Sequence, residues 1–318
     1  MNTKAHVGTV VVVAHDAGGA EVVSSYIRRE NLSCIYVLQG AAVSVFNRKL
    51  GDIEIVPLEE AFNRADWLLC GTSWQSDLEY EAIKMAKEQR KYSVAFLDHW
   101  VNYRERFERK GELHIPDEIW VGDESAASMA TRIFQDTSVR LVANPYFADI
   151  IGEINIAHEM HGNTSDNLKV LYVLEPIKEH ALRRFGNEYH WGYGEEDALR
   201  YFLDNLVIFN QTVDEIVLRP HPSEKIEKYK WVQSEYKIPI FFGGQNSLAD
   251  EIARSNVVVG CSSMAMVIGL LANKMVISSI PPEGCNYTLP QSEIIMLRDR
   301  LRSSVDESGT CHTVNGLI

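Results

Sequence analysis

Short apolar runs alternate with segments of helical spacing along the first half of the chain. The runs are rich in β-branched residues and have the length of buried strands, and the segments between them repeat apolar positions at the period of a helix. Such alternation is typical of parallel strands joined by crossover helices. It predicts strands at Val7–Ala14, Cys34–Leu38, Ile53–Val56, Trp67–Cys70, Ser93–Leu97, Glu118–Val121 and Val139–Val142, and helices at Ala20–Arg29, Ser76–Gln89 and Ser125–Phe134.

A polar stretch without period separates this region from a second one with the same alternation. Residues 158–167 read His-Glu-Met-His-Gly-Asn-Thr-Ser-Asp-Asn and lie near the middle of a chain of 318 residues, where a linker is expected. Beyond it the pattern predicts strands at Lys169–Leu174, Glu215–Leu218, Ile240–Phe242, Val257–Val259 and Met275–Ser278. The helices predicted there are Lys178–Arg184, Glu195–Phe209, Glu224–Tyr236, Leu248–Arg254 and Met264–Leu271.

The pattern therefore predicts an α/β protein of two tandem doubly wound, Rossmann-like lobes. The expected domains are residues 1–157 and 168–318, joined by the linker 158–167, and the last helix is free to pack back on the first lobe. In such sheets ligands bind beyond the carboxyl ends of the strands, so we expect the site in a cleft between the lobes. Ser76 with Glu79 has the spacing of a capping box for one of the helices.

The amino-terminal apolar run, Val7–Ala14, is too short to span a membrane and lacks the cleavage site of a signal peptide. No other run approaches ~18 residues, so we expect a soluble protein without a transmembrane segment. The five cysteines lie far apart without a Cys-x-x-Cys pair, which favours a reduced compartment over a disulfide framework or a zinc site. These features predict a cytoplasmic location.

Composition narrows the range of partners. Of the residues, 46% are hydrophobic and 24% charged, and 44 acidic against 31 basic side chains give a formal net charge of -13. Nucleic acids and anionic membranes both need a cationic face, so a general surface for either is disfavoured. Peripheral association with the inner membrane stays open. Any phosphate must be held by a local site.

The first candidate motif is Arg219-Pro220-His221-Pro222, at the end of an apolar strand. The two prolines restrict the backbone, so the imidazole is aimed with little conformational entropy left to lose. Together with Arg219, His221 can bind a phosphate oxygen or protonate a leaving group. The alternative is a strand-to-loop turn with a surface histidine.

The second motif is Gly260-Cys261-Ser262-Ser263, between a buried strand and an apolar helix. Ser262 or Ser263 is a good N-cap, and a helix start offers unpaired N–H groups and the positive end of a dipole. It can bind phosphate without net basic charge, which suits an acidic chain. An ordinary capped helix is the alternative.

The third motif is His15-Asp16-Ala17-Gly18-Gly19, after the first strand. It lacks the G-x-G-x-x-G fingerprint, which argues against an NAD enzyme. Gly18 and Gly19 allow another chain segment or a substrate to approach closely, and Asp16 with His15 can act as a base or bind a hydroxyl. Asp16 as a simple helix cap is the competing interpretation.

The fourth motif, Asp98-His99-Trp100, ends another strand and is followed by Tyr103. Flat aromatic faces beside acceptors are suited to sugars, so Trp100 and Tyr103 are candidate acceptor or sugar contacts, with Asp98 and His99 as a second acid/base pair. The alternative is a loop packed by its own aromatic side chains.

Weaker candidates complete the set. Glu175 ends the first strand of the second lobe and can face the donor, and Glu283 lies where it can accept from a ribose hydroxyl, although a plain turn is expected there. His158 and His161 lack a third ligand at metal spacing, so no metal site is predicted. Neither a G-x-S-x-G elbow nor a P-loop is present.

Together these features resemble bacterial GT-B-type glycosyltransferases, and more narrowly the sialyltransferase, polysialyltransferase and Kdo-transferase groups that use CMP-activated sugars. The resemblance rests on the two lobes, on His221-Pro222 after a strand and on Ser262-Ser263 opening a helix. It implies that these residues hold the CMP phosphate and that an acidic residue of the first lobe is the base. Those groups place the base in an acidic pair followed by glycine, which this lobe lacks, so Asp16 or Asp98 would substitute.

The resulting hypothesis is a metal-independent glycosyltransferase of bacterial surface polysaccharide synthesis. It would move a sugar, a CMP-activated nonulosonic acid or Kdo-like sugar by preference, to a hydroxyl of a glycan, lipid-linked or protein acceptor. The first lobe would hold the acceptor and the second the nucleotide sugar, with no separate cofactor. A nucleotide-sugar epimerase or hydrolase of the same fold is the alternative, and a two-lobed ligand-binding protein is a third class. Donor sugar, stereochemical outcome and oligomeric state are left open.

Overall fold

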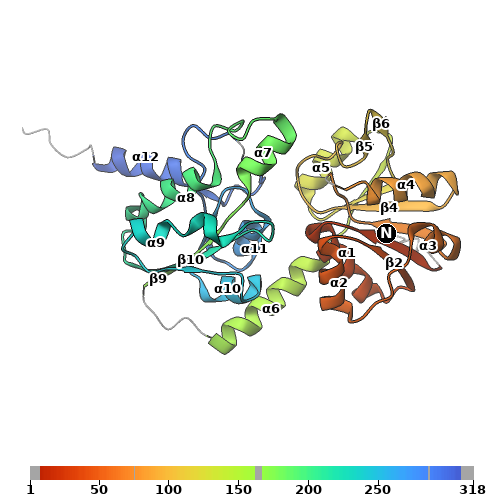
Figure 1. Ribbon diagram of the computed structural model, residues 1–318, viewed down its shortest axis with the longest axis horizontal. Helices are drawn as coiled ribbons and strands as arrows, with labels where there is room; N and C mark the ends of the chain where they lie inside the picture. The colour runs from red at the N-terminus through yellow and green to blue at the C-terminus, as the bar shows by residue number, and fades with distance from the viewer. Residues whose placement is uncertain (1–7, 75, 162–166, 286, 309–318) are drawn as a thin grey trace, which may run out of the picture. The chain divides into compact units, whose positions relative to one another are not determined.

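The computed structural model describes residues 8–74, 76–161, 167–285 and 287–308, with side chains as far as Arg302. Val7, Cys311 and the middle of the predicted linker lie outside the described residues. The chain divides into two compact units, Met1–Asp149 and Ile150–Ile318. Each unit contains a six-stranded sheet whose strands all run parallel (Figure 1). The prediction of two doubly wound α/β lobes is confirmed.

The sheet of the first unit has the order β2-β1-β3-β4-β7-β8. Alternate residues of its buried strands face opposite sides: Val10 and Val12 pack with the two helices that follow β1 and β2, and the helix after β3 packs on β1, β3 and β4. The strands are β1 Val10–Ala14, β2 Cys34–Leu38, β3 Trp67–Cys70, β4 Tyr92–Leu97, β7 Glu118–Val121 and β8 Ser138–Leu141. The helices are α1 Ala17–Glu30, α2 Ala41–Leu50, α3 Leu58–Arg64, α4 Leu78–Glu88 and α5 Glu124–Ile133, and β5 Glu108–Arg109 with β6 Glu112–Leu113 forms a small hairpin.

The sheet of the second unit has the order β11-β10-β9-β12-β13-β14. Val170 and Tyr172 face a core built with α8, and α10 and α11 pack against strands of the same sheet. The strands are β9 Leu168–Val173, β10 Val213–Arg219, β11 Ile240–Phe242, β12 Val257–Gly260, β13 Met275–Ser278 and β14 Ile295–Met296. The helices are α7 Ile177–Phe185, α8 Glu195–Leu203, η1 Leu206–Phe209, η2 Ile226–Tyr229, α9 Val232–Glu235, α10 Leu248–Arg254, α11 Met264–Leu271 and α12 Leu297–Ser308.

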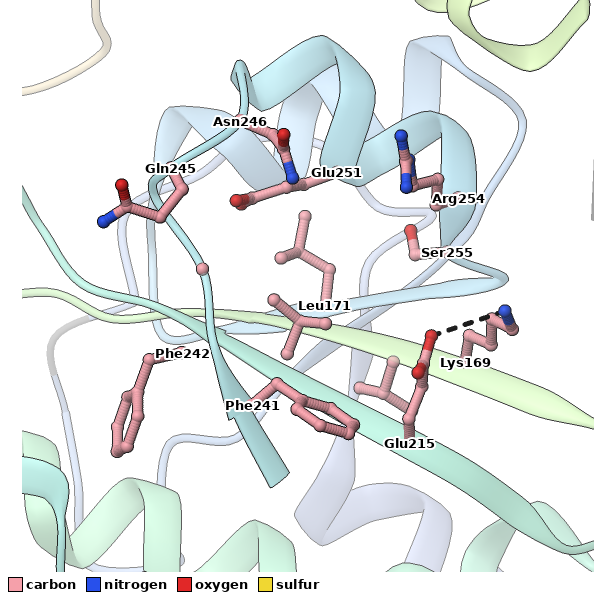
Figure 2. A pocket seen from close by; sticks show the side chains of 13 residues that line it. Lys169, Leu171, Glu215, Phe241, Phe242, Gln245, Asn246, Glu251, Arg254 and Ser255 are labelled. Carbon is pink, nitrogen blue, oxygen red and sulfur yellow. Dashed lines mark ion pairs between the residues drawn. The ribbon is translucent and has the colours of Figure 1, made fainter. Parts of the chain in front are cut away.

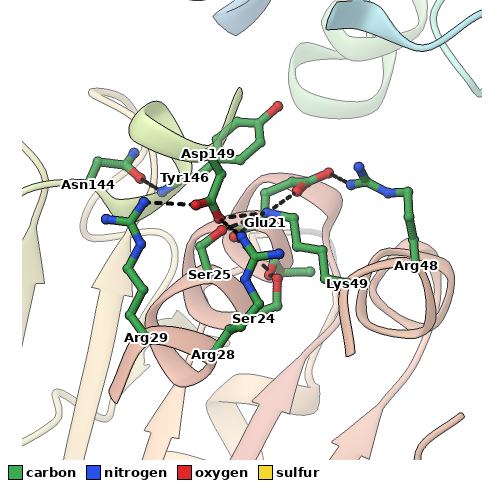
Figure 3. Close-up of polar contacts among 11 residues, drawn as sticks. Glu21, Ser24, Ser25, Arg28, Arg29, Arg48, Lys49, Asn144, Tyr146 and Asp149 are labelled. Atoms are coloured by element: carbon green, nitrogen blue, oxygen red, sulfur yellow. Dashed lines mark hydrogen bonds and ion pairs between the residues drawn. The ribbon is translucent and has the colours of Figure 1, made fainter. Parts of the chain in front are cut away.

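A long helix, α6 Pro145–His161, crosses the division between the units. Ion pairs hold its first turns to the first unit: Asp149 contacts Arg28 at 2.8 Å, Arg29 at 2.7 Å and Lys49 at 3.9 Å (Figure 3). Lys49 also pairs with Glu21 at 2.7 Å. The predicted boundary after residue 157 falls inside α6, because the polar residues 158–161 continue the helix.

Several predicted elements differ from those observed. Ile53–Val56 forms only an isolated bridge, from Ile55 to Tyr36. The predicted helix Glu224–Tyr236 is two short helical turns, and Glu195–Phe209 divides into α8 and η1. The capping box is wrong, because α4 begins at Leu78 and the Glu79 carboxylate instead accepts the backbone N–H of His15. The last helix packs on its own unit, where Leu297 is buried in the core and Leu301 packs against it.

Candidate functional site

Each sheet has a point at which the strand order reverses. It lies between β1 and β3 in the first unit and between β9 and β12 in the second. In doubly wound sheets the helices that follow the two central strands leave on opposite faces at such a point, which separates the loops at the carboxyl edge and makes it the usual place for a ligand. Most of the residues selected from the sequence follow these strands or their neighbours.

In the second unit, His221 lies in a tight turn after β10. The backbone N–H of Glu224 donates to the carbonyl oxygen of His221 at 2.8 Å, which closes the turn around Pro222 and Ser223. The N–H of Ser223 donates to Nδ1 of His221 at 3.2 Å, and the Ser223 hydroxyl lies 2.7 Å from the same atom. Because a backbone N–H can only donate, Nδ1 accepts, and the neutral ring carries its hydrogen on Nε2.

The surroundings of His221 favour the neutral form of its ring. Burial lowers the pKa of His221, and the charges of Glu224 and Glu179 only partly oppose that effect. A second imidazole, His180 on α7, lies with its ring centroid 6.4 Å away and nearly perpendicular to the first. Burial and the neighbouring His221 lower the pKa of His180 as well. The His221 ring, neutral with its hydrogen on Nε2, thus offers an N–H donor.

The serine motif sits at the reversal point. Ser263 is the N-cap of α11, with its hydroxyl accepting from the N–H of Ala265 at 3.2 Å, as in an ordinary capped helix. The Ser262 hydroxyl pairs with that of Thr288 at 2.7 Å. The N–H groups of Cys261 and Ser262 donate to Oε1 of Glu175 at 2.9 and 2.8 Å. An internal carboxylate therefore occupies the N–H groups of the two residues before the N-cap, of which Ser262 was expected to bind phosphate.

Glu175 reaches this position from the end of β9. Burial raises the pKa of Glu175 to about 7, against the two N–H groups that favour its charged form, and Glu224 raises it further. Glu175 was selected from the sequence as a residue facing the donor; in the structure it accepts from the loop just before α11. Near neutral pH it exchanges between a neutral and a charged form, so a phosphate and Glu175 would compete for the same N–H groups.

Two residues of the predicted phosphate site have other partners. Arg219 points to the opposite side of the sheet from the buried Leu218, and its Nη1 contacts Glu251 at 2.7 Å and the carbonyl oxygen of Asn246 at 3.1 Å. Gly260 is explained by packing, since a Cβ there would lie 2.7 Å from Cγ2 of Val173 on β9. Glu283 is exposed in a turn, which agrees with the alternative interpretation of that segment as a plain turn.

Glu251 and Asn246, the two partners of Arg219, line a groove in the second unit with a cavity volume of about 270 Å³ (Figure 2). Leu171, Val217 and Phe241 lie side by side on three neighbouring strands and form an apolar floor. Polar groups surround this floor: Gln245, Asn246, Glu251, Arg254, Ser255 and the ion pair between Lys169 and Glu215. An apolar floor with a polar rim can hold a flat ring.

In the first unit, His15 and Asp16 follow β1 at the reversal point. Nδ1 of His15 lies 2.7 Å from Oδ1 of Asp16, and both side chains are about one-third exposed, at 32% and 30%. Asp16 is the N-cap of α1 by position but makes no side-chain cap bond, so the simple cap interpretation fails. A carboxylate that orients an imidazole at an accessible edge can take a proton from a bound hydroxyl.

Behind this pair lies a buried acid that the sequence did not reveal. Glu79, on the first turn of α4, is 2% exposed and accepts the backbone N–H of His15 at 2.8 Å. Burial raises the pKa of Glu79 to about 7, with a further contribution from Asp16. The contact joins α4 to the loop after β1, 64 residues apart in the chain, which no local pattern predicts.

Asp98 lies beside the same loop but is held by a cation. Its Oδ1 pairs at 2.8 Å with Arg106, whose side chain is 6% exposed and also donates to the hydroxyl of Thr72 at 2.6 Å. A Cβ on Gly18 would collide with Oδ2 of Asp98, and a Cβ on Gly19 would lie 3.1 Å from Cα of Gly71. The two glycines therefore admit another chain segment, which was one of the two expectations for them.

The fourth motif is a packed loop. Trp100 and Tyr103 are 4% and 2% exposed, so they offer no open face to a sugar, and this expectation is corrected. Trp100 donates its indole N–H to Asp123 at 2.9 Å. His99 accepts the N–H of Trp100 at 2.9 Å, and burial lowers its pKa to about 4, so it does not form the expected acid/base pair with Asp98.

Within the described residues, no group of three or more His, Cys, Asp and Glu side chains is arranged to hold a metal ion. None of the described helices combines the length and the apolar character needed to cross a membrane. The cytoplasmic location stays a prediction.

No protein-family model and no curated protein matches the chain. Solved structures match it in fold. The UDP-GlcNAc 2-epimerase from Methanocaldococcus jannaschii covers 94% of this chain and 92% of its own at 11% identity, with a TM-score of 0.63. The H548A variant of the wall teichoic acid polymerase TagF covers 94% and 79% at 12% identity, with a TM-score of 0.53. The α/β-galactoside α-2,3-sialyltransferase from Photobacterium phosphoreum covers 92% and 98% at 9% identity, with a TM-score of 0.50.

Similarity at this level of identity concerns the fold. Two Rossmann-like domains with parallel sheets, matched over nearly the whole chain, give this protein the GT-B-type fold. The expected fold is thereby confirmed, and the narrower groups named from the motifs stay a prediction.

Proposed function

We propose that the protein is a glycosyltransferase that moves a sugar from a nucleotide donor to a hydroxyl acceptor. The observation that carries the proposal is the His221 turn. It holds a neutral imidazole with its N–H on Nε2 at the carboxyl edge of a GT-B-type second unit. The carboxyl ends of β10 and β12, which precede His221 and the serine motif, flank β9 and so lie about 10 Å apart, a span that one nucleotide sugar can bridge.

In this proposal the second unit binds the donor. His221 and the start of α11 meet the charge that develops on the leaving phosphate, and Ser262 and Ser263 hold the loop that presents the N–H groups. CMP is the proposed nucleotide, and a nonulosonic acid or Kdo-like sugar the proposed cargo, from the resemblance of the two motifs.

The first unit supplies the base. Asp16, oriented by His15, is accessible, whereas both oxygens of Asp98 lie against Arg106 or Gly18. We therefore assign proton abstraction from the acceptor hydroxyl to Asp16 and a structural role to Asp98. The acceptor is a glycan, lipid-linked or protein hydroxyl in bacterial surface polysaccharide synthesis, and the chemistry assigned to these residues uses no divalent metal.

A second candidate is a nucleotide-sugar epimerase or hydrolase. It is favoured by the fold similarity to a UDP-GlcNAc 2-epimerase at a TM-score of 0.63. One experiment separates the two: the protein is incubated with CMP- and UDP-activated sugars, with and without a panel of glycan acceptors. Transfer requires both substrates. Free sugar or a 2-epimer formed at a catalytic rate without acceptor would overturn the glycosyltransferase proposal.

A further inference from the structure

Glu224 is a buried glutamate with one unused carboxylate oxygen. Its side chain is 4% exposed, and its Oε1 accepts from the hydroxyl of Tyr229 at 2.6 Å and from Nζ of Lys228 at 2.9 Å. Its Oε2 is buried and has no hydrogen-bond partner among the described residues. Buried carboxylate oxygens are normally satisfied, because an unpaired one costs free energy, so this atom requires an explanation.

The backbone fixes Glu224 beside the catalytic imidazole. The turn bond from its N–H to the carbonyl of His221 sets the two residues at a constant separation. Its charge acts on His221 and on His180, in each case favouring the protonated ring. Among the described residues, Glu224 is therefore the acidic group that is buried, hydrogen-bonded to the backbone of His221 and electrostatically coupled to both imidazoles.

The other charged side chains that act on the two rings are less directly connected to His221. Glu179, on α7, favours the protonated form of both rings, and Arg183, on the same helix, opposes it at His180. On the other side of Glu224, Lys228 is shared with Glu195, and Glu175 lies close enough for its charge to be felt. None of these groups is joined to His221 by the turn.

We propose that Glu224 is a positioning residue that supplies the buried counter-charge for His221 and His180 when they bind a phosphate group. The neutral rings take up protons from water as the anion binds, and the nearby carboxylate makes their charged forms less costly. Ser223 suits both states, because its hydroxyl can accept from Nδ1 once that nitrogen is protonated. The inference rests on the proposed function only in taking a phosphate as the ligand.

Glu195 provides a matched control. It is 2% exposed and contacts the same Lys228, but its Oε2 is used by the N–H of Lys178 at 2.9 Å and it is not in the His221 turn. Glu195→Gln and Glu224→Gln therefore both remove one carboxylate charge from Lys228. Only Glu224→Gln removes a charge that acts on the two imidazoles.

The test is a histidine titration followed by NMR, together with calorimetry of CMP at pH 6 and pH 8. We expect the pKa of His221 to fall in Glu224→Gln and to stay at the wild-type value in Glu195→Gln. At pH 6, CMP affinity should weaken about tenfold in Glu224→Gln, the effect of removing an opposite charge next to the anion-binding group, with a smaller loss at pH 8. Glu224→Asp, which keeps the charge, should retain most of the affinity.

An unchanged titration of His221 in Glu224→Gln, or equal effects of the two glutamine variants on CMP affinity, would overturn the inference. Thermal unfolding of both variants shows whether each remains folded, and the NMR titration is read on the folded protein without any ligand. If His221→Ala binds CMP as tightly as wild type, the proposed function fails, and the titration still decides the coupling between Glu224 and His221.

Discussion

A buried glutamate lies at the point of strand-order reversal in each sheet, but its contacts have different consequences in the two units. In each unit a glutamate accepts backbone N–H groups at the carboxyl edge, and burial raises its pKa to about 7. Glu79 lies behind the loop of the first unit, 2% exposed, and braces His15. Glu175 holds the loop just before α11 in the second unit, where the proposed function places a phosphate. The same kind of contact thus supports a loop in each unit, and in the second unit it would compete with the proposed ligand.

The accessible side chains of the two units also differ in their chemistry. The first unit exposes an Asp16–His15 pair suited to taking a proton, and the second presents imidazole N–H groups suited to an anion. Acid/base work and phosphate binding are assigned to separate units on this basis. Substitutions in the two units should therefore have separable effects on turnover and on CMP binding.

The largest effect is expected from the proposed base. Asp16→Asn should lower kcat by about 10²–10⁴-fold, the usual contribution of a general base, with little change in CMP affinity. Asp98→Asn is the matched comparison, since it removes the same charge from the same edge. It should mainly lower the free energy of unfolding, by about 3 kcal/mol, because Arg106 is left buried without its partner. A larger loss of kcat in a stably folded Asp98→Asn would reverse the assignment.

His221→Ala should lower kcat about a hundredfold with the fold intact, as for other preorganised donors that meet transition-state charge. The measurement is steady-state transfer, with circular dichroism to confirm folding. His190→Ala is a suitable control, because His190 is exposed and stacks on Phe185 in the same unit. Near-normal turnover of His221→Ala would remove this residue from the site.

Stability should depend on pH through both glutamates. A carboxyl whose pKa is about 7 in the folded protein and about 4.3 when unfolded binds more protons in the folded state between those values. Stability contributed by these groups is therefore lost as pH rises from about 4.3 to about 7. Urea unfolding at pH 5 and pH 7.5 should show this fall in the wild type and a smaller one in Glu79→Gln and in Glu175→Gln. Equal slopes in all three proteins would contradict it.

The same two variants should differ in ligand binding. Glu175→Gln removes the charge that competes for the N–H groups of Cys261 and Ser262, so its CMP affinity at pH 8 should rise several-fold. Glu79→Gln should leave that affinity at the wild-type value. Calorimetry at pH 8 measures both, and an increase shared by the two variants would show that the two glutamates are not distinct in role.

The smallest effect is expected from the serine pair. Replacing Ser262 and Ser263 by alanine removes one helix cap and the bond to Thr288, which should cost about 1 kcal/mol of stability. CMP affinity should fall a few-fold, because the N–H groups remain but their loop is less well held. Unchanged CMP affinity would count against a role of this loop in phosphate binding.

The sequence predicted the elements well where the pattern was unambiguous. Strands β2, β3, β7, β11 and β13 and helices α10 and α11 have the predicted bounds, because buried parallel strands and capped apolar helices leave clear local signals. The long α6 was missed, since its polar last turn resembles a linker. The segment Glu224–Tyr236 was predicted as one helix. Its polar and irregular pattern does not reveal that it forms two short helical turns instead.

Side-chain partners were predictable only in part. The alternation along β10 places Arg219 on the opposite face from the buried Leu218, and there it pairs with Glu251. Burial of Trp100 and Tyr103 depends on how their loop folds on itself, which the composition of the loop does not reveal. The partners of Glu79 and Glu175 lie 64 and 86 residues away in the chain, so only the folded sheet brings them together.

The proposal that the second unit binds the phosphate and the first supplies the base is tested most directly by calorimetry. CMP is titrated into the wild type, His221→Ala and Asp16→Asn under the same conditions. CMP should bind to the wild type and to Asp16→Asn with the same Kd and at least about tenfold more weakly to His221→Ala. Equal Kd values for the wild type and His221→Ala, or loss of CMP binding in Asp16→Asn, would contradict it.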